Sequence, residues 1–252
     1  MNSFERHNIA HLSASQINSW INAPSLWLLE KLLGFRGAMG CAAHRGTATE
    51  AGVSAGLFDH SLDVEACTAV AMPIYDRLTA LSADPKRDSE RAVIPGMVAQ
   101  GLALRSHGAP IRPNSGDQHK VEIRLEGVPV PVIGYLDWLY ADEILDLKST
   151  LRVPSAMSET HLRQASIYKT AHMDRRVRFF YVSDKRSEKH TLTREQYDVA
   201  IRELTQAAQR LGRFLALSGD PHELAAIIPH SSESFYFNDP QTKAKAVETY
   251  GY

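Results

Sequence analysis

The chain has 252 residues, and its 28 Lys and Arg nearly balance its 29 Asp and Glu to give a net charge of -1. With 44% hydrophobic and 23% charged residues, it has the composition of a globular protein that buries a sizeable core. This composition excludes a collagenous, disordered or disulfide-rich chain. The charge excludes a globally basic nucleic-acid coat, although not a local basic groove.

Cysteine content and hydropathy narrow the class further. Cys41 and Cys67 are too few for a four-cysteine zinc site or a protein-held iron–sulfur cluster. We expect both to be buried thiols of a reducing cytoplasm. Neither a signal peptide nor a run of about 18 apolar residues is apparent. The sequence therefore predicts a cytoplasmic protein without a membrane partner.

Helical periodicity dominates the first part of the chain. After a loose leader over residues 1–11, Ser13 or Ser15 begins a helix that Pro24 interrupts. Pro73 should bend or break a later helix. Further helical segments are expected over residues 26–33, 44–57, 62–82 and 88–106.

The pattern changes after residue 116. Apolar and polar residues alternate in five segments that predict strands. These are residues 119–125, 130–140, 143–149, 177–183 and 188–192. A helix is expected over 155–173, and Thr193 begins a strongly amphipathic one.

This order of elements predicts one α/β (α+β) domain over residues 1–252, with a central mixed sheet flanked by helices. Residues 1–115 form its mainly helical part, 116–218 its catalytic core and 219–252 a tail. In the tail, Phe235-Tyr236-Phe237 is a packing anchor, or else a site for a partner or for base stacking. We favour packing.

The segment Gly134–Thr150 carries the chemistry. If Ala141-Asp142 is a two-residue hairpin loop, Asp137 lies opposite Asp146 on the same face of the hairpin. Lys148, two residues further along, joins that face. The other face is entirely apolar, which supports this register. It carries Leu136, Trp138, Leu145 and Leu147.

Two adjacent carboxylates repel each other, so one should be protonated unless a cation lies between them. Carboxylate oxygens favour Mg²⁺ or Mn²⁺, and one or two ions would fit. An ammonium beside the metal can orient or deprotonate an attacking water, or stabilise charge at phosphorus. The alternative interpretation is an exposed sheet face with a Lys–Asp ion pair, since Asp-x-Lys alone is common.

Four motifs, in family order, resemble those of the PD-(D/E)XK nuclease superfamily and of its RecB-like and phage exonuclease branches. They are Gly46-x-x-x-Glu50, Gly134-x-x-Asp137, Asp146-x-Lys148 and Gln164-x-x-x-Tyr168. The resemblance extends over residues 13–215 and implies a restriction-endonuclease-like core with a helical N-terminal part. Several relatives bind a four-cysteine iron–sulfur cluster, which this chain cannot hold.

The resemblance also implies roles for these residues. Asp137, Asp146 and Glu50 would be metal ligands, with the Leu147 carbonyl as a further oxygen. Lys148 would be the catalytic lysine. Two other side chains, Gln164 and Tyr168, would share one helix face and position DNA or the carboxylates. The alternative interpretations are that Glu50 is an acid on a solvated helix face and that Gln164 and Tyr168 are a pair on a helix surface.

Positive charge gathers after the (D/E)xK motif. From Lys148 to Arg186 the chain has nine Lys or Arg and three Asp or Glu. A basic patch of this kind can contact phosphates, although it can also be a solvated helix face. The residues that we expect to contact DNA are Arg45, Ser149, Thr150, Arg152, Arg163 and Lys169.

The function implied is that of a metal-dependent DNA exonuclease that leaves 5′-phosphates, in phage or bacterial recombination, repair or DNA degradation. Its partners would be DNA and a single-strand annealing or recombination protein, in a bacterial or host cytoplasm, and it could be an oligomer. A structure-specific endonuclease, an inactive nucleic-acid-binding accessory protein and a small-molecule hydrolase are the alternatives. These residues decide neither polarity nor strand preference.

Overall fold

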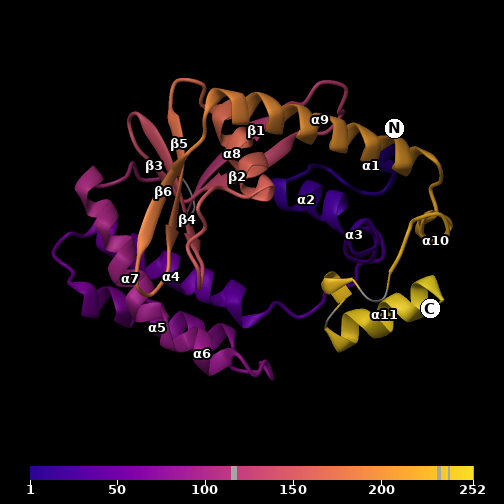
Figure 1. Cartoon of the computed structure of the whole chain (residues 1–252). Coiled ribbons are helices and arrows are strands. Elements are labelled where there is room, and N and C mark those ends of the chain that lie inside the picture. The colour runs from indigo at the N-terminus through magenta and orange to yellow at the C-terminus, as the bar shows by residue number, and fades with distance from the viewer. Residues whose placement is uncertain (115–117, 232–233, 238, 252) are drawn as a thin grey trace.

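A computed structural model describes residues 1–114, 118–231, 234–237 and 239–251 of the chain. It confirms the mixed α/β class: helices come first, and a sheet with a crossover helix follows (Figure 1). The predicted division between residues 115 and 116 lies outside the described residues. In the part of the chain that the structure describes, no helix combines the length and the apolar character needed to span a bilayer.

Helices fill the chain before the first strand. They are α1 (Ser3–Arg6), α2 (Ala14–Asn22), α3 (Pro24–Lys31), α4 (Cys41–Phe58), α5 (Val64–Leu78), α6 (Arg87–Ala92), α7 (Ile94–Gly101) and the 3-10 helix η1 (Leu102–His107). The prediction of a loose leader is wrong, because a capping box forms around α1 and Phe4 is buried. Helix α5 is not broken and continues through Pro73. The helix expected over 88–106 is divided, because Pro95, which lacks an N–H, lies in the first turn of α7.

The second half holds the strands and the remaining helices. They are β1 (His119–Ile123), β2 (Val132–Leu136), β3 (Trp138–Leu139), β4 (Glu143–Ser149), α8 (Glu159–Ala171), β5 (Arg176–Val182), β6 (Ser187–Thr191), α9 (Arg194–Ala216), α10 (Pro221–Ala225), η2 (Phe235–Phe237) and α11 (Pro240–Tyr250). Strands β1 and β2 form an antiparallel pair. The order in the larger sheet is β3-β4-β5-β6, with β4 and β5 parallel.

The strand expected over 130–140 bends at Asp137 and divides into β2 and β3. After the bend, β3 pairs with β4, whereas β2 before it pairs with β1 in the smaller sheet. Leu136 is therefore buried in one hydrophobic cluster and Trp138 in another. The prediction that these two side chains share a face with Leu145 and Leu147 is wrong for Leu136.

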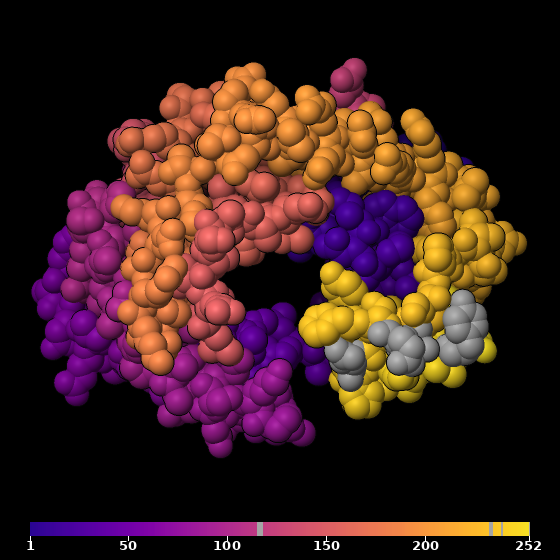
Figure 2. Space-filling model, viewed as in Figure 1, coloured from indigo at the N-terminus to yellow at the C-terminus, as the bar shows by residue number. Residues whose placement is uncertain are grey.

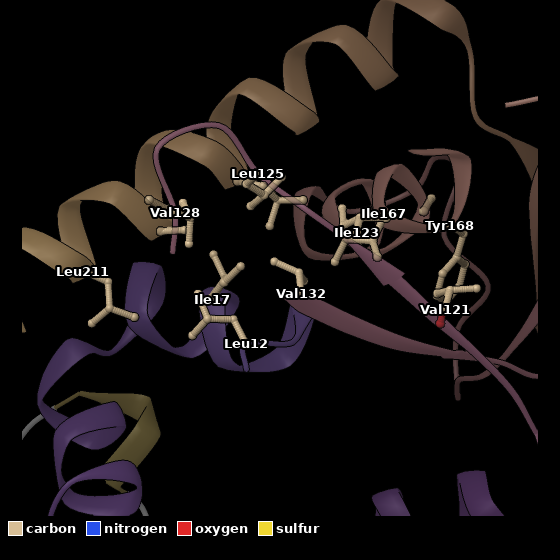
Figure 3. Close-up of a cluster of buried hydrophobic side chains, with 14 of the residues drawn as sticks. Leu12, Ile17, Val121, Ile123, Leu125, Val128, Val132, Ile167, Tyr168 and Leu211 are labelled. Carbon is tan, nitrogen blue, oxygen red and sulfur yellow. The ribbon is translucent and has the colours of Figure 1, made fainter. Parts of the chain in front are cut away.

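Strand β4 separates two hydrophobic clusters, because alternate side chains point to opposite faces. Leu145 and Leu147 pack with residues of α4, α7 and η1. Ile144, on the opposite face, belongs to the larger cluster between α2, α8, α9 and the β1–β2 pair, shown in part in Figure 3. Asp146 and Lys148 are on the face of Ile144, which places them toward α8.

The C-terminal segment packs against the N-terminal helix α3. Leu29 of α3 forms a small buried cluster with Phe237 and Ala246. Only part of the predicted packing anchor is buried, because Phe235 is 80% exposed and Tyr236 is 43% exposed. With α9 along one side and α4 to α6 along the other, this docking leaves an opening near the middle of the molecule (Figures 1 and 2).

Candidate active site

The predicted pairing of the two aspartates is confirmed. In the β3–β4 pair, Trp138 lies opposite Leu145, and continuing this register places Asp137 opposite Asp146. Because β2 has left the sheet at this point, the edge of β4 is open here. Asp137 Oδ2 accepts a hydrogen bond at 2.8 Å from the Leu147 N–H in place of a strand carbonyl. The N–H and C=O of a strand residue point to the same side, so the Leu147 carbonyl faces this edge too.

Asp146 is the most enclosed carboxylate of the site, with 1% of its surface exposed. Its Oδ1 accepts hydrogen bonds from Gln164 Nε2 and Tyr168 Oη, both at 3.1 Å. Its Oδ2 lies 2.5 Å from Lys148 Nζ in an ion pair and has no hydrogen-bond partner of normal geometry. The two α8 residues of the predicted Gln-x-x-x-Tyr pair therefore both hold this aspartate rather than lie on the surface.

Glu50 of α4 is connected to Asp137 by Gln118, a residue that the sequence analysis did not select. Gln118 Nε2 donates to Glu50 Oε1 at 3.0 Å and to Asp137 Oδ1 at 3.3 Å. The amide thus lies between two carboxylates, where it neutralises neither. Nothing in the sequence around Gln118 indicates this role, because it precedes β1 and its partners are on other elements.

Arg45 attaches α4 to the end of β4. Its Nη2 donates to the Ser149 carbonyl at 3.1 Å, and its Nη1 forms a buried ion pair with Glu90. This arrangement places Glu50, a little more than one turn further along α4, beside the strand that carries Lys148. We interpret Arg45 as a positioning residue for Glu50.

Electrostatic repulsion shifts the protonation of the acids. Burial, then the Asp146 and Glu50 carboxylates, raise the pKa of Asp137 well above its usual value. Burial and Asp146 likewise raise the pKa of Glu50. Burial alone would lower the pKa of the Lys148 ammonium, but the surrounding carboxylates outweigh it and raise that pKa. Lys148 is therefore protonated at neutral pH.

Helix α8 contributes a third side chain that the sequence analysis did not select. His161 Nδ1 lies 2.7 Å from Tyr181 Oη, and burial together with the Lys148 charge lowers the pKa of His161 to about 4. It is neutral at pH 7. His161, Gln164 and Tyr168 occupy positions i, i+3 and i+7, and this helical spacing is the signal that could have found it.

Gly134 allows the close approach of α8 to β2. A Cβ at this position would lie 3.1 Å from Tyr168 Cε1 and 3.1 Å from Val121 Cγ2, tighter than ordinary contact. With the space clear, Tyr168 Oη shares its single proton between Asp146 Oδ1 and the Tyr135 carbonyl, which lies 2.7 Å away. The glycine of the Gly-x-x-Asp motif thus lets the tyrosine lie against the strand that leads to Asp137.

Two of the predicted DNA contacts lie inside the protein. Arg45 and Arg163 are 5% and 4% exposed. Arg163 donates to Glu203 at 3.1 Å and to Glu159 at 3.0 Å. Because their guanidinium groups are buried and ion-paired, neither presents a phosphate-binding surface, which corrects the interpretation of these two residues.

The other predicted contacts lie closer to the surface. Lys169 Nζ donates to two backbone carbonyls just beyond the C-terminus of α8, at 2.7 and 2.8 Å. Ser149 and Thr150 are half-buried at the end of β4, and Arg152 is exposed. Among the expected DNA contacts, Arg152 is the cation best placed to meet a phosphate.

A pocket of about 640 Å³ opens beside the carboxylates. Asp137, Gln118, His161 and Gln164 line its inner side. Polar residues at the start of α2 and along it form another wall, and none of the described residues that line the pocket is a Lys or Arg. The α2 wall is Ser13, Ala14, Ser15, Asn18, Ser19 and Asn22.

The donor set of the site fits a hard divalent cation. Carboxylate oxygens are the ligands that Mg²⁺ and Mn²⁺ prefer. Burial, and after it the neighbouring carboxylates, raise the pKa values of Asp137 and Glu50, and Lys148 offsets this only in part. Asp146 Oδ2 is buried, and its ion-pair partner is the same Lys148 ammonium that faces the other two carboxylates. In the described part of the chain, however, no three His, Cys, Asp or Glu side chains are already arranged to hold a metal ion. Binding would require Gln118 to release the carboxylates.

Comparisons with known proteins give a fold and no closer relationship. No family model matches the chain, and no curated protein matches it. Its structure resembles that of a "putative exonuclease" from Eubacterium rectale, with a TM-score of 0.55 and 12% sequence identity over 85% of each chain. At this identity the likeness shows that the two proteins share a fold.

Proposed function

We propose that this protein is a metal-dependent nuclease that hydrolyses DNA phosphodiester bonds and leaves 5′-phosphates. The observation that carries the proposal is the convergence of Glu50, Asp137 and Asp146 on a single ammonium, Lys148, beside a polar pocket. The fold shared with a protein described as an exonuclease supports it. Two other classes are disfavoured. Pure binding needs no such lysine, and the excess of Lys and Arg between Lys148 and Arg186 favours a polyanion over a small molecule.

Asp137, Asp146 and Glu50 are the residues that would hold Mg²⁺ or Mn²⁺, with the Leu147 carbonyl at the same edge. When bound, the ion would supply Lewis acidity toward water and phosphate oxygens. Tyr168 and Gln164 keep the Asp146 carboxylate in a fixed orientation through its Oδ1. That preorganisation lowers the cost of bringing the charges together.

Lys148 stabilises negative charge at phosphorus in this proposal. Its raised pKa keeps it protonated, so it acts as a cation and hydrogen-bond donor rather than as a base. A carboxylate of the site, Glu50 where it does not bind the ion, would accept the proton of the attacking water. Water then displaces the 3′-oxygen, and the phosphate stays on the 5′ side.

An exonuclease is favoured over an endonuclease. The opening next to the pocket is bordered by the helical part, α2 and the C-terminal segment (Figure 2). A free strand end can enter such an enclosed opening, whereas a closed circle cannot without rearrangement. A structure-specific endonuclease remains the second candidate on the same residues.

The test is a gel series with the purified full chain. Linear duplex, linear single strand and covalently closed circular DNA, with labelled ends, are incubated with Mg²⁺, Mn²⁺ or EDTA. The wild type should degrade linear DNA only with metal and spare circles, and the label should give the polarity. Lys148→Ala should still bind DNA but cut none of the substrates.

Each other outcome has a defined meaning. Cut circles would select the endonuclease. Normal cutting by Lys148→Ala would overturn the assignment of the site. If DNA shifts on a native gel but is never cut, the protein is a binding protein on this fold. Arg36→Ala, which changes a charge on the loop after α3, is the matched control and should cut like the wild type.

A further inference from the structure

Two tyrosine rings line the same pocket as Asp137 and are open to solvent. Tyr135 of β2 is 53% exposed and Tyr236 of η2 is 43% exposed. A tyrosine ring has an apolar face and a polar hydroxyl, so an exposed one can stack on a ligand while its hydroxyl stays in water. Tyr168, which also lines the pocket, is instead 1% exposed and tied to Asp146. The two open rings have no such structural role.

Both rings are carried by backbone that is held in place. The Tyr135 carbonyl accepts the 2.7 Å hydrogen bond from Tyr168 Oη. Next to Tyr236, Phe237 is 2% exposed and packs in the small cluster on α3. Tyr250 of α11 donates to the Ser25 carbonyl of α3 at 2.6 Å. The exposure of Tyr236 therefore belongs to a docked segment rather than a loose tail, and η2 borders the opening in Figures 1 and 2.

The pocket lacks the charges that usually hold a polyanion. None of its described lining residues is Lys or Arg, and its α2 wall consists of serines, asparagines and one alanine. Hydroxyl and amide groups can hydrogen-bond to phosphates and sugars. They do not supply the counterion release that drives most binding to duplex DNA. Aromatic stacking is the remaining source of affinity, at about 1–3 kcal/mol per base.

We propose that Tyr135 and Tyr236 are stacking platforms for unpaired bases and that the substrate enters the pocket as a single strand. This inference rests on the proposed function, because it states which form of DNA presents its phosphate to the carboxylates. In a duplex each base already stacks on its neighbours, so a side-chain ring can stack only on an unpaired base. Tyr236 thus makes the C-terminal segment part of substrate binding.

The first experiment measures stacking without cutting. A single-stranded oligonucleotide that contains 2-aminopurine is titrated with Lys148→Ala protein in Mg²⁺, and the quenching of its fluorescence is recorded. Adding Tyr236→Ala or Tyr135→Ala to that background should weaken binding about tenfold and reduce the quenching. Tyr236→Phe, which keeps the ring, should restore both.

The second experiment measures turnover. The ratio of kcat/KM for a single-stranded oligonucleotide to kcat/KM for bis(p-nitrophenyl) phosphate, which has no base, should fall about tenfold in each alanine variant. Leu217→Ala is the matched control, because Leu217 is an exposed large apolar side chain that does not line the pocket. It should keep the wild-type ratio.

The outcomes separate the two proposals. If the wild type hydrolyses neither substrate, the nuclease assignment fails, whereas the quenching still tests the stacking. If Tyr236→Ala binds and quenches like its parent, or if Leu217→Ala causes the same loss as Tyr236→Ala, the stacking proposal is overturned. A duplex bound as tightly as the single strand and weakened equally by the alanine variants would also overturn it. Melting temperatures within a few degrees of wild type show that each variant is folded.

Discussion

Strand β4 carries two buried acids, three residues apart, in opposite electrostatic situations. Glu143, 2% exposed, is ion-paired with Arg178 at 2.7 Å and also with His107. Asp146, 1% exposed, has Lys148, but that ammonium also faces Asp137 and Glu50. Burial is the same, and only the balance of charge differs. In the proposed site, a deficit of positive charge, rather than burial, distinguishes Asp146 from Glu143.

The same contrast holds on the helical side. Glu90 is 4% exposed and has Arg45 as its own partner. Breaking such a pair leaves an uncompensated buried charge, which typically costs 3–5 kcal/mol. By contrast, removing one carboxylate from the site relieves repulsion. Functional and structural acids should therefore respond to neutral substitution with opposite signs of stability change.

The largest expected effect is on activity. Asp146→Asn keeps the size of the side chain and removes its charge, so cleavage should fall on the order of 10³-fold. The free energy of unfolding should stay the same or rise, because the repulsion with Asp137 and Glu50 is reduced. Nuclease assays and urea unfolding measure the two quantities. A stable, fully active variant would remove Asp146 from the site.

Glu143→Gln should show the reverse. It leaves Arg178 and His107 without their shared anion, so the free energy of unfolding should fall by about 3 kcal/mol. Its activity per folded molecule should remain that of the wild type, because Glu143 does not line the pocket. Urea unfolding at pH 7 is the measurement, and Asp142→Asn, at an exposed ion pair, is the control with an expected loss below about 1 kcal/mol.

The pH dependence of stability should reveal the charge deficit. Because the pKa values of Asp137 and Glu50 are raised, the folded chain holds more protons than the unfolded chain above about pH 4. Their contribution to stability is therefore lost as pH rises through the raised values. Asp137→Asn should lessen this loss.

Free Mg²⁺ at 100 times its Kd should stabilise the wild type by about 2.7 kcal/mol at pH 8. The same Mg²⁺ concentration should stabilise Asp146→Asn much less.

The smallest effect concerns the packing that orients Asp146. Gly134→Ala places a Cβ 3.1 Å from the Tyr168 ring and should cost about 1–2 kcal/mol, with a moderate loss of activity as the ring moves. Gly40→Ala, where a Cβ meets no heavy atom within 4 Å, should change stability by about 0.5 kcal/mol or less. Equal melting temperatures for the two variants would show that the contact relaxes freely.

Local patterns in the sequence were enough to predict the centre of the site. The two-residue turn at Ala141-Asp142 sets the register of β3 on β4, so the pairing of Asp137 with Asp146 follows from counting. The helical spacing of Gln164 and Tyr168 is equally local. Both predictions depend on residues that are close along the chain or joined by a tight turn.

The remaining features depend on long-range contacts. Gln118 joins Glu50 and Asp137 from 68 and 19 positions away, and Arg163 meets Glu203 across 40. A single sequence does not show which buried acid satisfies which arginine, so Arg45 and Arg163 were expected at the surface. The bend at Asp137 was not predicted although Asp is depleted in strands, because strand-forming residues continue on both sides of it.

The docking of α11 on α3 has a consequence for how the chain is made. Ser25 and Tyr250, joined by a 2.6 Å hydrogen bond, are 225 positions apart. At roughly 5–20 residues per second of translation, Ser25 is synthesised about 10–45 s before its partner. The strand and helix that hold the carboxylates leave the ribosome earlier, while the wall that bears Tyr236 is added last. Nascent chains should therefore assemble the acid cluster before the pocket wall that bears Tyr236 is in place.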